Sequence, residues 1–405
     1  MDMEMYSRAR TKSTTELLET YSSEKHPFLY INGEKTLRSE GVAHEVDGVP
    51  MNDGRFAERL ANAFTVAKLK GVIDPIVVGA IPFSRDEKPH LHIPFHVDVA
   101  KGNFFGESEL ETAVKAISTA NEFPLRMDYE GMVARGVEAI GLGKLDKLVL
   151  GRTLRLTSED VINHTQLLSN LASDNHDGFT FAVALPSAEP KRRILMGASP
   201  ELLVRKKGQL VSVNPLAGSR PRSADPIEDQ RRADELLASE KDLHEHALVV
   251  EAIAEQLRPI CDEIHIPDTP SVIHTKAMWH LSTYISAVPS PAYRSASAIA
   301  NVLHPTPAVC GFPRTVAADH IKELEEENRH FFTGLVGWEN EYGDGEWAIA
   351  IRCAEVSDNN LVLFAGAGIV ADSTPMEEAD ETAAKFQTMM RALRQTNGRG
   401  GNASE

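Results

Sequence analysis

Two charged residues interrupt apolar stretches of the chain and could move protons. Lys147 lies in the apolar run 145–150, where strand alternation places it on an otherwise apolar face. Such a lysine is either a charge that guards a sheet edge or a desolvated amine that can act as a base. Glu201 follows the small residues 197–200, and its carboxyl either faces water or, if desolvated, acts as a general acid. In one pocket the two would form a proton-transfer pair.

Two acidic segments have the spacing of a helix face. Asp242 and Glu245 are three residues apart, and so are Glu378 and Glu381, with Lys385 four residues further on. If the two faces meet, they could bind one hard cation, because carboxylates and water suit Mg²⁺ and do not suit zinc. The alternative is two solvated faces of an acidic protein.

Three other features could bind a ligand. Arg352 ends the apolar run 349–351, and its guanidinium would pair with a carboxylate of either a substrate or the protein. The segment 305–308, Pro-Thr-Pro-Ala, is a rigid turn. Gly-Ala-Gly at 366–368 lacks the third glycine of a dinucleotide loop, so it is either a place where a ligand approaches the backbone or a bulged strand end.

The composition narrows the range of partners. Of 405 residues, 59 are acidic and 42 are basic, which gives a net charge of −17. This balance argues against a nucleic-acid binder, which needs a basic face, and against docking on an anionic membrane surface. We therefore expect neither nucleic acid nor a membrane surface as a partner.

The sequence also indicates the cellular setting. The three cysteines are far apart, which argues against a disulfide scaffold or a zinc ribbon. Residues 1–24 contain no apolar core of a signal peptide, and no apolar run is long enough for a transmembrane helix. A cytoplasmic protein with reduced thiols is predicted.

The helices and strands that must position these residues do not alternate regularly along the chain. Short β segments follow one another through brief turns, which predicts an α+β fold with mostly antiparallel pairing. One domain is expected over 27–396, after a flexible segment at 1–26 and before a disordered tail at 397–405. Helices are predicted at 55–70, 125–140, 227–257, 297–303, 313–326 and 374–395. Strands are predicted in a hairpin at 28–46, at 75–82, 145–156, 178–185, within 193–216, at 272–287, and in a meander at 331–339, 346–356 and 361–370.

Taken together, these segments resemble the chorismate-utilising enzymes, which include anthranilate, aminodeoxychorismate, salicylate and isochorismate synthases. The resemblance covers about residues 75–393 and is strongest to isochorismate synthases of siderophore pathways. The segments that carry it are 80–83, the strand of Lys147, 197–201, 215–219, 239–246, 279–281, 304–308, 331–334 and 378–385. The family's fold is a single α+β domain with two large, mostly antiparallel sheets stacked face to face and helices outside.

The resemblance implies a role for each matching charged residue. Lys147 would activate the water that attacks C2 of chorismate, and Glu201 would protonate the departing C4 hydroxyl. Arg352 would bind the enolpyruvyl carboxylate. Glu245 and Glu381 would hold Mg²⁺, which would hold the ring carboxylate. Asp242 and Glu378 would lie near the metal, largely through water, and the pocket would be lined by Gly218, His280, Phe332, Gly366 and Lys385.

Two positions indicate which member of the family the chain resembles. Salicylate synthases, which go on to expel pyruvate, carry threonine and tyrosine where this chain has Ala308 and Phe332. The chain thus resembles an isomerase that stops at isochorismate and feeds a catechol siderophore through 2,3-dihydroxybenzoate, with downstream pathway enzymes as candidate partners. The alternatives are a salicylate synthase and a non-catalytic relative that binds chorismate. Val309 and Cys310 depart from the family's usual leucine and serine, which affects only the fine shape of the pocket.

Overall fold

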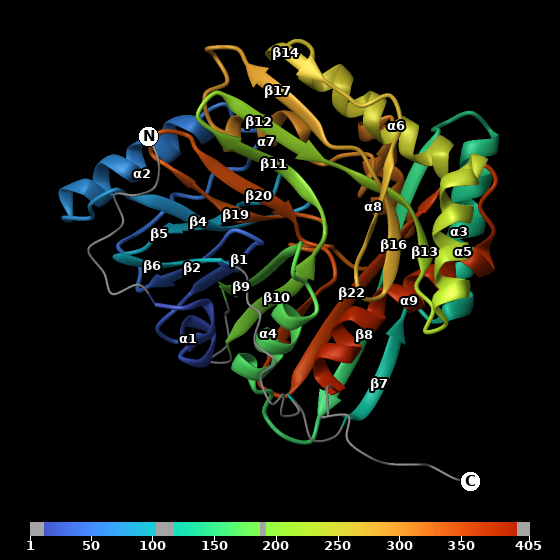
Figure 1. Cartoon of the computed structure of the whole chain (residues 1–405), viewed down its shortest axis with the longest axis horizontal. Helices are drawn as coiled ribbons and strands as arrows, with labels where there is room; N and C mark the ends of the chain where they lie inside the picture. Colours follow the sequence, from blue (N-terminus) through green and yellow to red (C-terminus); the bar gives the residue numbers. More distant parts are fainter. Residues whose placement is uncertain (1–11, 103–112, 114–116, 187–191, 395–405) are drawn as a thin grey trace.

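The computed structural model describes residues 12–102, 113, 117–186 and 192–394 (Figure 1). Its largest sheet has ten strands, and all its pairs are antiparallel. β7 (Ile117–Phe123) pairs with β8 beside the main path. Along that path the strands are β18 (Gly311–Phe312), β8 (Lys147–Ser158), β22 (Asn360–Ile369), β21 (Cys353–Ser357), β10 (Arg193–Ser199), β9 (Phe179–Leu185), β1 (Phe28–Ile31), β2 (Lys35–Glu40) and β6 (His96–Lys101).

A second large sheet of nine strands and a small sheet of three are also antiparallel throughout. The small sheet consists of β13 (Leu216–Pro221), β16 (Met278–Ser282) and β15 (Ser271–His274). The predicted α+β class with antiparallel pairing is therefore confirmed. In order, the nine strands are β14 (Cys261–His265), β17 (Ile285–Pro289), β12 (Leu210–Asn214), β11 (Leu202–Lys207), β20 (Gly345–Ile349), β19 (Leu335–Asn340), β4 (Ile76–Ile81), β5 (His90–Ile93) and β3 (His44–Glu45).

The two large sheets stack face to face around an apolar core. Phe181 of the first sheet packs in one cluster with Val78 and Val336 of the second. Strand β4 is apolar throughout because it is buried on both faces. Val78 faces the other sheet, whereas Val77 belongs to a cluster that includes Leu60 of the covering helix α2 (Phe56–Leu69).

The helices lie outside the sheets, as predicted (Figure 1). With α2, helices α6 (Glu240–Leu257) and α7 (Ala296–Leu303) cover the second sheet. The first sheet is covered by α1 (Thr14–Glu19), α4 (His164–Ser173) and α9 (Pro375–Arg394). Helices α3 (Arg126–Gly141) and α8 (Arg314–Leu324) pack against β8, and α5 (Pro226–Ala238) lies on the small sheet.

Two of the points where the chain passes from one large sheet to the other lie at predicted site residues, and these two crossings correct one prediction. It passes from β10 to β11 at Glu201, and from β20 to β21 at Arg352, which has a φ of 51°. The Ala198 N–H donates to Arg352 O at 3.1 Å, and the Ile349 N–H donates to Glu201 O at 3.1 Å. The meander predicted over 331–370 is wrong, because β19 and β20 belong to one sheet and β21 and β22 to the other.

Two predicted elements are divided by polar residues. The helix predicted at 227–257 breaks at Ser239, whose extended backbone (ψ 110°) ends α5 and whose hydroxyl accepts the Asp242 N–H to cap α6. The strand predicted at 272–287 is instead β15, β16 and the start of β17. The Thr275 hydroxyl accepts two N–H groups in the turn between β15 and β16, which reverses the chain there.

The segment predicted to be flexible at 1–26 contains a helix in its described part. Ser13 caps α1 by accepting the Glu16 N–H, and Leu17 and Leu18 are fully buried against the first sheet. Burial of the two leucines holds this helix against the first sheet. Residues 1–11 and the tail predicted at 397–405 lie outside the described residues. The three cysteines are free, and no described helix is both long and apolar enough to cross a membrane.

Candidate active site

A cavity of about 610 Å³, partly open to solvent, lies where the two crossings meet β13, β16 and the acidic helices α6 and α9. Sequence-predicted residues from nine separate segments face it together. Lys147, Asp242 and Glu378 are buried behind this lining. The predicted residues that line the cavity are Glu201, Gly218, Glu245, His280, Ala308, Phe332, Arg352, Gly366, Glu381 and Lys385.

Glu201 is a buried carboxyl at the first crossing. Burial raises its pKa from 4.5 to about 7, although a hydrogen bond from the Leu216 backbone and the charges of Lys147 and Arg352 oppose the rise. A carboxyl with this pKa is largely protonated just below neutral pH and can donate its proton. The alternative that Glu201 faces water is therefore wrong, since only 3% of it is exposed.

Lys147 is completely buried at the start of β8, beside the cavity. Its Nζ lies 2.8 Å from Oε1 of Glu245, which lines the cavity from α6. β8 pairs with β18 on one side and β22 on the other, so Lys147 does not guard a free sheet edge. A methyl group at Gly368 would collide with the Glu245 carboxylate and come within 3.1 Å of Lys147 Cε. The glycine thus leaves room for this ion pair.

The two acidic helix faces meet, as the cation-site hypothesis requires. Lys241 Nζ on α6 lies 2.9 Å from Glu378 Oε1 on α9. Asp242 and Glu378 are 3% and 1% exposed, so solvated acidic faces are excluded. Each carboxylate of the two faces has a basic partner: Lys147 with Glu245, Arg220 with Asp242, Lys241 with Glu378, and Lys385 with Glu381.

Two of these carboxylates hold a proton more tightly than usual. Burial and then the charge of Glu381 raise the pKa of Glu378 to about 7, and burial also raises the pKa of Asp242. Within the described ranges, no three carboxylate, imidazole or thiolate side chains lie close enough to hold a metal ion as they stand. By type, however, the residues fit Mg²⁺, because Glu245 and Glu381 bring hard oxygen donors to the cavity from two helices.

Two buried groups of the cavity have unsatisfied hydrogen-bonding atoms. Burial lowers the pKa of Arg352 to about 10, so the guanidinium is charged at neutral pH. Its Nε has no hydrogen-bond partner, and no carboxylate in the described part of the chain forms an ion pair with it. His280 shares a 2.8 Å hydrogen bond with Ser219 through Nδ1, but its Nε2 is also unpartnered. Burial pushes the pKa of His280 well below its usual value, which leaves the ring neutral.

Small residues and one lysine shape the cavity near α9 and α6. Gly218 has a φ of 77°, and a methyl group there would lie 3.1 Å from Asp242 Cβ. Lys385 donates to the backbone oxygen of Gly366 at 2.8 Å, in addition to its ion pair with Glu381. Gly366 lies on the cavity surface, and approach of a ligand there stays a prediction.

One wall of the cavity is apolar. Phe332 stacks on Phe364 with ring centroids 5.2 Å apart and an interplanar angle of 15°. Ala308 lies on the turn that follows His304, whose ring Nε2 is 3.0 Å from the Pro82 carbonyl oxygen. Neither Ala308 nor Phe332 brings a hydroxyl group to the cavity.

Sequence reasoning missed several residues of the site. Phe364 and Thr333 line the cavity, and Ser219 orients His280. His246 holds α6 against the small-sheet side of the site, with Nε2 2.7 Å from Thr283 Oγ1 and Nδ1 3.2 Å from the Ala217 oxygen. His246 ends the segment 239–246 that carries the family resemblance, and it lies four residues after Asp242 on the same helix face, but no role was assigned to it.

Comparison with known proteins yields one family. Residues 102–394 match the family model described as "Chorismate binding enzyme". The chain is 45% identical to isochorismate synthase DhbC of Bacillus subtilis, over 90% of this chain and 93% of that protein. It is 38% identical to the vibriobactin-specific isochorismate synthase of Vibrio cholerae, over 94% of this chain and 95% of that protein. The crystal structure of a putative 2,3-dihydroxybenzoate-specific isochorismate synthase, DhbC from Bacillus anthracis, superposes with a TM-score of 0.88 at 44% identity and covers 93% of this chain and 98% of that one.

Proposed function

The chain belongs to the family of chorismate-binding enzymes, and from this premise we propose that it is an isochorismate synthase, an isomerase that converts chorismate to isochorismate. The observation that carries the proposal is the cavity in which Glu201, with a pKa of about 7, is combined with the Lys147–Glu245 pair and an unpaired buried guanidinium. This set supplies a proton donor, a basic group and an anchor for a carboxylate.

The proposed reaction uses Lys147 as the base and Glu201 as the acid. Lys147 acts in its neutral amine form: it takes a proton from the water that attacks C2 of the ring, and the adjacent Glu245 carboxylate then pairs with the ammonium that forms. As the ring double bonds shift, Glu201 gives its proton to the C4 hydroxyl, which leaves as water. One water is consumed and one is released, so substrate and product are isomers.

Substrate binding requires local positive charge, because chorismate carries two carboxylates and the protein has a net charge of −17. We assign the enolpyruvyl carboxylate to Arg352, whose Nε lacks a partner. Glu245 and Glu381 would hold Mg²⁺, with Asp242 and Glu378 acting largely through water. When bound, the metal supplies a positive charge for the ring carboxylate.

The names of the relatives indicate the use of the product. One relative is named for vibriobactin, and the solved structure is titled as 2,3-dihydroxybenzoate-specific. We propose that isochorismate from this enzyme likewise supplies a catechol siderophore. Ala308 and Phe332, which add no hydroxyl group to the cavity, are consistent with release of isochorismate before pyruvate is lost.

Product analysis tests this function. Purified protein, chorismate and Mg²⁺ should yield isochorismate alone, and EDTA should stop its formation, as measured by chromatography. Formation of salicylate and pyruvate would mean that the protein is a salicylate synthase and that our interpretation of Ala308 and Phe332 is wrong. Thermal stabilisation by chorismate and Mg²⁺ without any conversion would instead indicate a non-catalytic binding protein.

A second prediction concerns the metal. Glu245→Gln should abolish activity together with its Mg²⁺ dependence, because it removes an anionic ligand from the cavity and also the partner of Lys147. In a thermal-shift titration, Mg²⁺ should raise the melting temperature of the wild type and not that of the variant. Glu251→Gln on the same helix is the matched control, since Glu251 is exposed, lies outside the cavity and pairs with Arg258. Full activity of Glu245→Gln without added Mg²⁺ would refute the metal assignment.

A further inference from the structure

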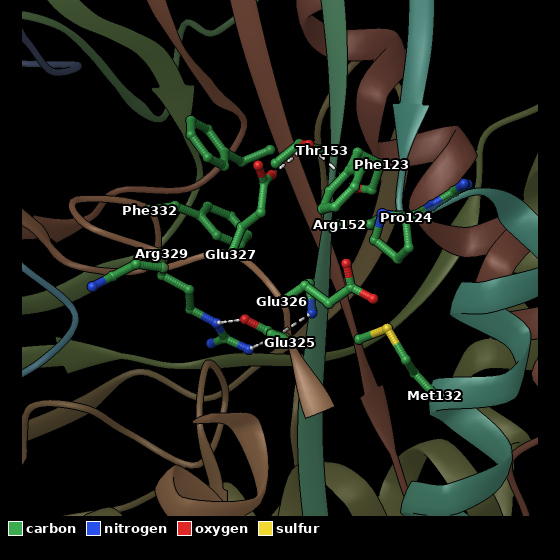
Figure 2. Close-up of a pocket in the computed structure, with 13 residues that line it drawn as sticks. Phe123, Pro124, Met132, Arg152, Thr153, Glu325, Glu326, Glu327, Arg329 and Phe332 are labelled. Carbon is green, nitrogen blue, oxygen red and sulfur yellow. Dashed lines mark hydrogen bonds and ion pairs between the residues drawn. The ribbon is translucent and has the colours of Figure 1, made fainter. Parts of the chain in front are cut away.

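A second cavity adjoins the substrate cavity on the other side of the Phe332–Phe364 pair. It has a volume of about 350 Å³, part of which is open to solvent. Both rings line both cavities, so the stacked pair is the partition between them. Figure 2 shows this second cavity, with Arg329 and Glu325 beside Phe332. Its remaining lining is Phe123, Pro124, Met132, Gly151, Arg152, Thr153, Glu326, Glu327 and Asn328.

Arg329 connects the segments that form this partition. The guanidinium donates to the Val309 oxygen at 2.7 Å, to the Val149 oxygen at 2.7 Å and to Thr333 Oγ1 at 3.4 Å. All three acceptors belong to residues that line the substrate cavity. They lie on the turn of Ala308, on β8 two residues after Lys147, and directly after Phe332. One buried side chain therefore sets the relative positions of three separate segments.

Glu325 holds Arg329 in this orientation. Its Oε2 accepts from Arg329 Nε at 2.8 Å, and its Oε1 accepts from Arg329 Nη2 and, at 2.7 Å, from the Gly151 N–H. Arg329 also lies over the Phe83 ring, 4.5 Å from its centroid, and 5.9 Å from the centroid of Phe332. Both charged side chains are buried, at 3% and 7% exposed, so the geometry leaves them little freedom.

Gly151 limits the position of Phe332 from the side of β8. A methyl group at Gly151 would lie 3.1 Å from Phe332 Cε1 and 3.4 Å from Glu325 Oε1, which is closer than ordinary contact to the ring. Any such group would press Phe332 toward the substrate cavity, because Phe332 separates the two cavities.

We propose that Arg329, held by Glu325, is the positioning residue that sets the Phe332 wall of the substrate cavity relative to Lys147. Arg329 acts through Val149, Val309 and Thr333 and does not touch the substrate. The inference rests on the proposed isochorismate synthase function. Arg329 would act on the rate through the position of the substrate, because a small displacement of a bound substrate from its reacting groups lowers the rate of the chemical step.

The test combines kinetics with chemical rescue. Arg329→Ala should lower kcat/KM for chorismate by about 10²-fold, with most of the loss in kcat, because the wall loses its fixed position. Guanidinium chloride should restore part of this activity, since the guanidinium site borders the second cavity. Arg38→Ala is the control, because Arg38 is equally buried and pairs with Asp98 outside both cavities. It should lose stability but keep wild-type kcat and KM and show no rescue.

Gly151→Ala provides an independent test that leaves the ion pair chemically intact. Pressure on Phe332 should raise KM several-fold while the variant remains folded by circular dichroism. Wild-type kcat and KM in both soluble Arg329→Ala and Gly151→Ala would overturn the proposal. So would unfolding of Arg329→Ala combined with wild-type kinetics of Gly151→Ala. Failure of the wild type itself to convert chorismate would refute the proposed function instead.

Discussion

Replacing Lys147 with methionine should reduce kcat by a factor of about 10²–10⁴, the range typical of a lost general base. Methionine fills a similar volume in this fully buried position, so the loss should reflect chemistry more than packing. The substitution removes the Nζ that lies 2.8 Å from Glu245 Oε1 and leaves that buried carboxylate without its basic partner. Some loss of thermal stability is therefore expected in the absence of Mg²⁺. Steady-state kinetics and thermal unfolding, both with and without Mg²⁺, measure these effects.

Lys206→Met is the matched control for Lys147→Met. Lys206 Nζ lies 2.8 Å from Asp344 Oδ1, and the lysine is buried while Asp344 is partly exposed, so its replacement also breaks a partly buried ion pair, but outside the cavity. The control should lose stability and keep wild-type turnover per folded molecule. If Lys147→Met were as active as this control, Lys147 would not be the base.

Glu201→Gln should also reduce kcat by about 10²–10⁴, because the amide keeps the shape of the side chain but has no proton to transfer. In the wild type, kcat/KM should fall as the pH rises through about 7, where Glu201 loses its proton. The residual activity of the variant should lack this alkaline fall. A pH–rate profile of the two proteins measures both effects.

Glu339→Gln is the control for Glu201→Gln. Burial raises the pKa of Glu339 to about 7 as well, but its carboxylate caps Ser297 at α7, away from the cavity. This variant should keep the alkaline fall of the wild type. An unchanged pH profile in Glu201→Gln would show that another group donates the proton.

The same pKa shift affects stability with a defined sign. The pKa of Glu201 is higher in the folded state than its ordinary value of 4.5, so the folded state binds the proton more tightly. Its contribution to stability is present below pH 4.5 and is lost as the pH rises to about 7. Above that pH the wild type contains a buried charge that Glu201→Gln lacks. The melting temperature of the variant minus that of the wild type should therefore be larger at pH 8 than at pH 5.

Local patterns were sufficient to predict most elements of the fold. The turn of the first hairpin at Asn32 and Gly33, the apolar run of β4 and the helical patterns of α2 and α9 depend on neighbours within a few residues. The break at Ser239 was also a local signal, because serine is a preferred helix cap, but it was hidden within an otherwise continuous helical pattern.

The sequence by itself determined the chemical types at the site. A lysine and a glutamate in apolar runs, two acidic faces with helical spacing, and an arginine after a buried strand are properties of the chain read in order. They also carried the resemblance to chorismate-utilising enzymes, which the comparisons confirm.

Only the tertiary structure decided between the alternatives that these patterns left open. Burial of Glu201 raises its pKa, and pairing of β8 on both edges encloses Lys147. The assignment of β20 and β21 to different sheets places Arg352 at a crossing, and Arg329 finds acceptors up to 180 residues away in sequence. Desolvation and long-range pairing depend on which distant segments meet, and no local pattern encodes that meeting.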